Sequence, residues 1–125
     1  MTQSFDFDTE ETHKSNLLIQ AALLRDMGDM EQSSTNFAAA AEIEERLAQR
    51  AEAQNDAAKA MRLWYSAASA WAYAGDFHHA LTLLHTLEAR PDTPTVLRAR
   101  VQAFSQTVRQ QRKHWQEMLR ELASA

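Results

Sequence analysis

Cysteine is absent from the 125-residue chain, and glycine and proline occur only twice each. The lack of thiols excludes disulfides, thiolate nucleophiles and thiolate metal ligands, and it fits a reducing compartment. With glycine only at positions 28 and 75, a glycine-rich phosphate loop or a dinucleotide-binding fingerprint is excluded as well. Abundant alanine and leucine with so few chain breakers favour long helices.

Long apolar runs are also missing. The sequence contains no stretch of roughly 18 apolar residues and no basic leader followed by an apolar segment. We therefore expect a cytoplasmic protein without a membrane-spanning or secretory segment. A chain of this length fits one domain with a single hydrophobic core.

The formal net charge of −4 is unevenly distributed. Residues 1–60 carry twelve acidic and five basic side chains, whereas residues 61–125 carry five acidic and eight basic ones. The mild total charge does not indicate a nucleic-acid-binding protein. The asymmetry predicts that the two halves attract each other, within the chain or in a head-to-tail assembly.

Apolar residues three and four positions apart predict five helices. The expected boundaries are about 10–27, 30–54, 57–74, 77–89 and a final helix that opens at Thr93-Pro94, with the Thr93 hydroxyl as its cap and Pro94 as its first residue. The breaks between the first four carry a stop followed by an aspartate that can cap the next helix: Gly28-Asp29, Asn55-Asp56 and Gly75-Asp76. The chain is therefore expected to be one all-helical domain, residues 10–125.

Residues 1–9 lack a helical apolar stripe and are acidic, so they are expected to form a flexible arm. Thr9 is the expected cap of the first helix. Phe5 and Phe7 have two possible roles: they cover the nearest helix pair, or they dock on a partner protein.

The final helix has the most regular apolar period of the chain. Its stripe advances in alternating steps of four and three and consists of Leu97, Val101, Phe104, Val108, Gln111, Trp115, Met118 and Leu122. Such a heptad is typical of a seam against another long helix. We expect the acidic second helix to close this seam through Ile43, Leu47 and Ala51, which gives a monomer. The alternative is a weak symmetric homodimer through the C-terminal helix.

The stretch around Gly75-Asp76 resembles a tetratricopeptide (TPR) unit. The matching residues are Trp64, Ala68, Trp71, Gly75-Asp76, Ala80 and Leu84. One clear unit covers about 61–94, and a degenerate unit around Gly28-Asp29 covers about 14–47. The two turns lie 47 residues apart, whereas such repeats recur every 34 or so. The resemblance implies a TPR-like stack of helical hairpins with a long C-terminal capping helix.

In tetratricopeptide proteins, one side of the first helix of each pair lines a concave groove that holds a partner peptide. The corresponding residues here are Arg62, Tyr65, Ser69 and Tyr73 in the clear unit and Leu18 and Arg25 in the degenerate one. The resemblance implies a non-enzymatic protein-binding module, either an adaptor or a small acidic chaperone. An immunity or inhibitor protein is an alternative function. An alternative role for Tyr65 and Tyr73 is packing, in which neighbouring helices cover both side chains.

A metal protein or enzyme built on His78, His85 and Glu88 is the competing hypothesis. Metal-binding helices usually place ligands three or four residues apart, and His78 and His85 are seven apart. We therefore expect these side chains to form a solvated polar face, and we expect no cofactor or metal. The basic side chains of the final helix, Arg109, Arg112, Lys113 and Arg120, are expected to pair with the second helix and not with nucleic acid.

Overall fold

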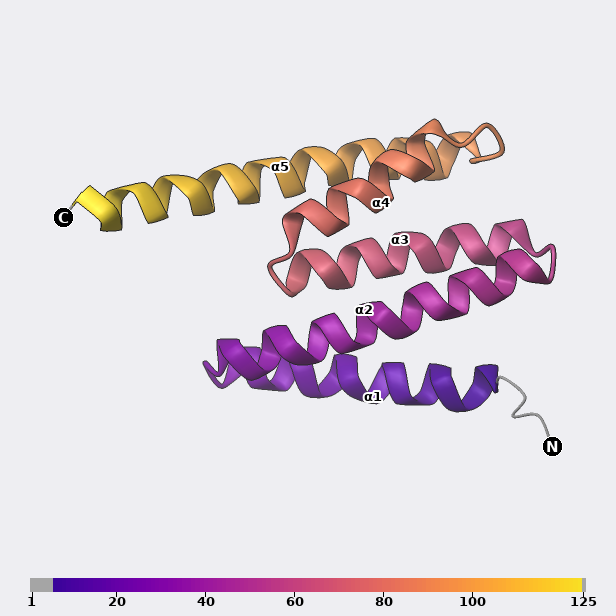
Figure 1. Ribbon diagram of the computed structural model, residues 1–125, viewed down its shortest axis with the longest axis horizontal. Coiled ribbons are helices and arrows are strands. Elements are labelled where there is room, and N and C mark those ends of the chain that lie inside the picture. The colour runs from indigo at the N-terminus through magenta and orange to yellow at the C-terminus, as the bar shows by residue number, and fades with distance from the viewer. Residues whose placement is uncertain (1–5, 125) are drawn as a thin grey trace.

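The computed structural model describes residues 6–124 as five α-helices stacked in chain order (Figure 1). The helices are α1 (Phe7–Asp26), α2 (Met30–Ala53), α3 (Ala57–Tyr73), α4 (Phe77–Ala89) and α5 (Thr95–Ser124). No strand occurs among these residues, so the predicted all-α class is confirmed. The predicted bounds of α4 are also confirmed.

The three junctions between the first four helices share one local design. Asp29, Asp56 and Asp76 each accept a hydrogen bond from the backbone amide three residues later, which caps α2, α3 and α4. The residue before each cap has a positive φ, of 85° at Gly28, 61° at Asn55 and 87° at Gly75. A left-handed residue followed by an aspartate therefore ends one helix and begins the next.

Helix α1 begins earlier than the sequence indicated. Asp6, and not Thr9, is its cap: the Asp6 carboxylate accepts hydrogen bonds from the amides of Asp8 and Thr9 and from the Thr9 hydroxyl. The Thr9 hydrogen bonds lower the pKa of the Asp6 carboxyl. Phe7, predicted to belong to a loose arm, lies in α1 and packs under Lys59, whose Nζ is 4.2 Å from the ring centre. Phe5 lies outside the described residues.

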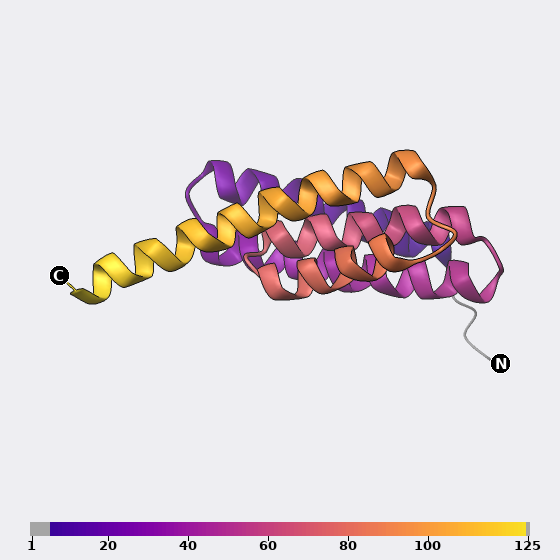
Figure 2. The ribbon, with the colours of Figure 1, turned by 90° about the horizontal axis from the view of Figure 1, so that it is seen from above.

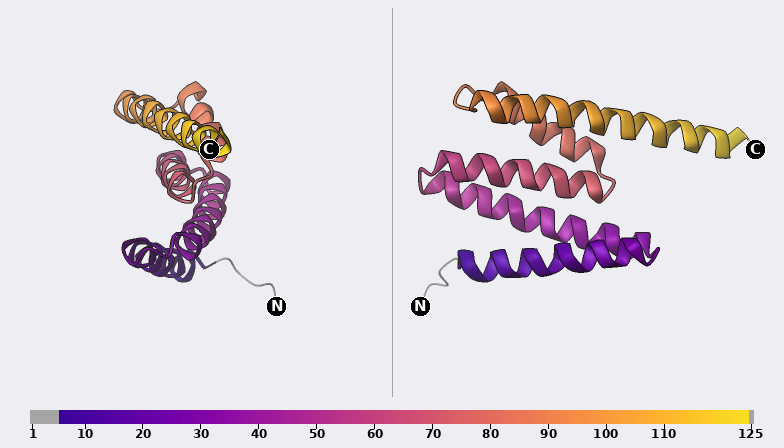
Figure 3. Two further views of the ribbon diagram at one scale, coloured as in Figure 1. Left: turned by 90° about the vertical axis from the view of Figure 1, so that its left-hand side faces the viewer. Right: turned by 180° about the vertical axis from the view of Figure 1, so that it is seen from behind.

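The helices form two antiparallel hairpins, α1 with α2 and α3 with α4, and α5 packs on α4. Figure 3 (left) shows α1, α3 and the first part of α5 on one side of the stack, with α2 and α4 on the other. Two groups of buried side chains hold the stack. One joins α3, α4 and α5 around Leu84, Leu87, Val101 and Val108, and the other joins α2 and α3 around Ile43, Leu47 and Leu63.

Small residues let the helices approach closely. Ala21, Ala40, Ala48, Ala68 and Ala80 are fully buried, so neighbouring backbones meet with only a methyl group between them. Large residues fill the remaining space.

A polar contact joins α2, α3 and α4 near the junction between α3 and α4. The Glu45 carboxylate on α2 accepts a hydrogen bond from the Trp71 indole of α3 at 2.6 Å and lies 2.8 Å from His79 Nε2 of α4. The Trp71 and His79 rings stack with centroids 4.1 Å apart. Trp71 therefore contributes both buried apolar area and a directional link between helices.

The junction between α4 and α5 differs from the prediction. Thr93 does not cap α5: its buried hydroxyl donates to the Leu87 carbonyl at the end of α4, at 2.7 Å. The Arg98 guanidinium donates to the backbone carbonyls of Glu88, Arg90 and Thr93. These bonds satisfy carbonyls that the end of a helix leaves free.

The prediction that α2 closes the seam of α5 is wrong. Ile43, Leu47 and Ala51 are buried against α3 and α1, and α3 and α4 lie between α2 and α5 (Figure 1). The predicted charge pairing fails for the same reason. Three acidic side chains of α2 have partners outside α5: Glu44 pairs with Lys14, Glu45 contacts His79, and Glu52 pairs with Arg90.

Candidate functional site

The outward face of α3 carries the side chains that the resemblance pointed to. Arg62, Tyr65, Ser69 and Tyr73 recur three or four residues apart and so share one side of the helix. The opposite side, with Ala67, Ala68 and Trp71, is buried. Together with Arg25 of α1, which lies beside Tyr73, we call these four residues of α3 the arginine–tyrosine face.

At one end of this face, residues from three helices meet. The Tyr73 ring stacks on Phe37 of α2 with centroids 5.2 Å apart, and the Arg25 guanidinium of α1 lies 5.6 Å from the Tyr73 ring and 6.0 Å from Phe37. Tyr73 remains 60% exposed, whereas Phe37 is buried. The structure thus brings together Arg25 and Tyr73, two predicted site residues, in a cation–π arrangement that leaves an aromatic surface accessible.

The middle of the face is partly covered. Tyr65 is half-buried against Phe104 of α5, with ring centroids 5.8 Å apart, and Ser69 is half-buried one turn further along. Leu18 of α1 is also half-buried and packs against the main core. Coverage of Tyr65 by the final helix, one of the alternatives from the sequence, is therefore correct in part. Leu18 contributes to packing more than to a free surface.

At the other end, Arg62 borders an open hollow of about 240 Å³ between α3 and the start of α5. The hollow is mostly apolar and is lined by Ala58, Met61, Arg62, Pro94, Val96, Leu97 and Arg100. Arg100 therefore adds a second cation beside Arg62. About 17 Å separates Arg62 from Tyr73 along the helix, because each residue advances the axis by 1.5 Å.

The face is cationic and poor in compensating acids. No ion pair found among residues 6–124 involves Arg62 or Arg100. Arg25 has only a long contact with the exposed Asp26, at 3.8 Å. Unpaired guanidinium groups beside aromatic and aliphatic side chains suit a ligand that carries both carboxylates and apolar groups.

Sequence reasoning missed Phe37, Phe104 and Arg100 as members of this surface. Phe104 was predicted to lie in the apolar stripe of the final helix, and it is half-buried. Phe37 is buried. Arg100 lies one position before the buried Val101. The heptad of α5 gave a signal for it, since a residue beside a seam position faces the neighbouring helix.

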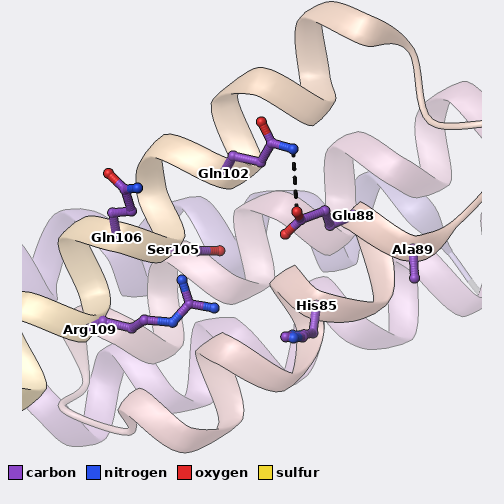
Figure 4. Close-up of a pocket in the computed structure, with 7 residues that line it drawn as sticks. All are labelled: His85, Glu88, Ala89, Gln102, Ser105, Gln106 and Arg109. Atoms are coloured by element: carbon purple, nitrogen blue, oxygen red, sulfur yellow. Dashed lines mark hydrogen bonds between the residues drawn. The ribbon is translucent and has the colours of Figure 1, made fainter.

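A second, more polar hollow of about 610 Å³ lies between α4 and α5 (Figure 4). It is lined by His85, Glu88, Ala89, Gln102, Ser105, Gln106 and Arg109, and Gln102 donates to Glu88 at 3.3 Å. His78, the third member of the metal hypothesis, is not part of the lining. In the described part of the chain, no three His, Asp or Glu side chains come together as metal ligands would.

None of the helices in residues 6–124 combines the length and the apolar character needed to cross a membrane. Comparison of the chain with protein-family models, with curated proteins and with solved structures gave no match.

Proposed function

We propose that this chain is a non-enzymatic protein-binding module that holds a peptide segment of its partner along the arginine–tyrosine face. The observation that carries the proposal is the exposed Tyr73 ring with Arg25 above it, at the far end of α3 from the unpaired Arg62 and Arg100. Aromatic and arginine side chains are the types most often found at binding hot spots. The partner segment is expected to combine carboxylates with apolar side chains.

We infer that the two hairpins are TPR-like units. The regular turns support stacked hairpins: Asp29, Asp56 and Asp76 each donate a backbone hydrogen bond to the carbonyl five residues earlier, at 2.8, 2.9 and 2.9 Å. The resemblance of the two glycine-aspartate turns to each other supports the repeat. Ser33 stands where the clear unit has Ala80; it is buried, and its hydroxyl donates to the Ala21 carbonyl at 2.7 Å. A small residue thus occupies the helix crossing in both units. In this reading, α5 is the capping helix.

The test starts from a displayed library of random peptides, selected on the purified protein. Enriched peptides should contain Asp or Glu beside apolar residues. Their affinity, measured by fluorescence anisotropy, should fall by about tenfold or more in Tyr73→Ala and in the double variant Arg62→Ala/Arg100→Ala, and should fall further as salt rises. Adaptor and chaperone roles share this surface, and the sequence of the selected peptides is the first guide to the natural partner.

The matched control is His78→Ala, an exposed substitution on α4 away from the face. It should leave peptide affinity unchanged. Selected peptides that bind all variants equally would contradict the proposal. Stoichiometric zinc, iron or manganese in the purified protein would instead favour the metal hypothesis.

A further inference from the structure

The apolar stripe of α5 continues well beyond the part that packs on α4. Val101 and Val108 are completely buried, but Trp115, Met118 and Leu122, which follow at the same spacing, are 52%, 39% and 71% exposed. Leu119 lies beside them and is 48% exposed. The sequence pattern is the same on both sides of Val108, and only its surroundings change.

The exposed part of the stripe lies on a projecting segment. Every residue from 113 to 124 is exposed, and Figures 1 and 2 show α5 extending past the ends of the other helices. We call residues 113–124 the overhang; its length is about 18 Å. A helix of only 12 or so residues is marginal in water without tertiary contacts, and this one exposes a tryptophan, a methionine and two leucines on one side.

We propose that the overhang pairs in antiparallel orientation with the overhang of a second copy of this chain. A two-fold symmetric contact requires a patch that complements itself. The apolar stripe meets this requirement because Trp115 of one copy can pack against Met118 of the other. The start of the stripe in each copy then covers the end of the stripe in the other copy.

The charges of the segment select the antiparallel orientation. Arg109 and Arg112 lie just before the overhang, and the overhang itself carries Lys113, Glu117, Arg120 and Glu121. With Trp115 opposite Met118, antiparallel pairing places Arg112 of each copy opposite Glu121 of the other and Lys113 opposite Arg120. Parallel pairing would place every one of these charges against the same charge of the other copy, which is repulsive throughout.

Two acidic groups elsewhere in the chain are already paired and do not neutralise the cations of this segment. Glu44 and Glu52 on α2 are already paired with Lys14 and Arg90. The overhang pair is short, so the buried area falls at the low end of specific interfaces and the dimer is expected to be weak. Its population must therefore depend on protein concentration.

Sedimentation over about a hundredfold range of protein concentration tests the proposal. Wild type should pass from monomer to dimer, whereas Trp115→Glu should stay monomeric with an unchanged helical spectrum, because the exposed indole contributes little to the fold of one chain. Val96→Glu is the matched control: Val96 is 74% exposed on the same helix but outside the overhang, and this variant should dimerise like wild type. A wild type that is monomeric throughout, or a Trp115→Glu variant that dimerises normally, would overturn the proposal.

Disulfide trapping tests the orientation. Because the chain has no cysteine, each introduced thiol is unique. Pairing of Trp115 with Met118 places Gln111 opposite Leu122, so a mixture of Gln111→Cys and Leu122→Cys chains in a glutathione redox buffer should form the mixed disulfide. Leu122→Cys alone should not cross-link. Efficient cross-linking of Leu122→Cys with itself would overturn the antiparallel arrangement, and binding to a different protein without any self-association would overturn the choice of partner.

Discussion

The two parts of α5 show how one apolar pattern can serve two purposes. Up to Val108 the stripe packs against α4 and α3: Val101 and Val108 are buried in the main core, and Leu97 and Phe104 are half-buried against it. From Trp115 onward the same heptad spacing continues without a neighbour in the chain, and each of its large apolar side chains is at least 39% exposed. The spacing thus indicates that the helix needs a partner along its whole length, but the partner itself depends on where the other helices end.

The largest difference in the free energy of unfolding is expected between alanine variants of two tryptophans, Trp71 and Trp115. Trp71 is 8% exposed and donates to Glu45, so Trp71→Ala should lower the free energy of unfolding by about 3 to 5 kcal/mol through the cavity and the lost hydrogen bond. Trp115→Ala should change it by less than about 0.5 kcal/mol when the protein is monomeric. Urea unfolding of both variants at low protein concentration measures this. Equal losses would mean that the overhang is part of the folded core.

A buried ion pair gives the next largest effect. Glu44 is 2% exposed; one of its carboxylate oxygens is 3.2 Å from Lys14 Nζ, and the other has no hydrogen-bond partner. Lys14→Met should therefore cost about 1 to 3 kcal/mol at neutral pH, because it leaves a buried carboxylate unpaired. The double variant Lys14→Met/Glu44→Met should regain most of this loss. A double variant as unstable as the single one would show that the pair itself stabilises the α1–α2 contact.

The same carboxyl gives a pH dependence. Burial raises the pKa of Glu44 above its ordinary value, and Lys14 opposes the shift only in part. The folded state therefore holds this proton more tightly than the unfolded state, and wild type loses stability as pH rises above about 4.5. Relative to Glu44→Gln, wild type should thus become less stable between about pH 4 and pH 7. Unfolding free energies across this range measure the difference, and a constant difference would contradict the buried environment of Glu44.

Substitutions in the turns between helices are expected to change the free energy of unfolding least. Gly75 has a φ of 87°, which an L-residue rarely adopts, so Gly75→Ala should cost about 1 kcal/mol. Asn55→Gly, at a φ of 61°, should be neutral or slightly stabilising. Neither change touches the overhang, and both should leave self-association unchanged. A shift of the dimer equilibrium in Gly75→Ala would show that the stack and the overhang are coupled.

The helix boundaries could be predicted because their causes are local. Asp29, Asp56 and Asp76 each cap the helix that begins at the next residue, and a left-handed residue precedes each of them. Where two caps compete, local reasoning was less secure. Asp6 and Thr9 both suit the start of α1, and the structure uses Asp6 as the cap and Thr9 as one of its donors.

The partner of α5 could not be predicted, because charge and length alone do not specify a neighbour. Acidic side chains of α2 contact Lys14 of α1 and the imidazole of His79 on α4, and not the basic side chains of α5. The arginine–tyrosine face was predicted residue by residue from the resemblance, and Arg25 and Tyr73 do meet. The heptad of the final helix placed Phe104 in the seam and Arg100 beside it, but the sequence did not reveal that α3 is the neighbour of both residues.

The stripe of α5 packs into the core of the chain up to Val108, and beyond it we propose that the stripe joins two copies. The most direct measurement compares Val101→Ala with Leu122→Ala, by urea unfolding at low concentration and by the dissociation constant of self-association. Val101→Ala should lower the free energy of unfolding by about 1 to 2 kcal/mol and leave the dissociation constant within about twofold of wild type. Leu122→Ala should leave unfolding unchanged and weaken association by about tenfold. Loss of monomer stability in Leu122→Ala, with association intact, would contradict this division of the stripe.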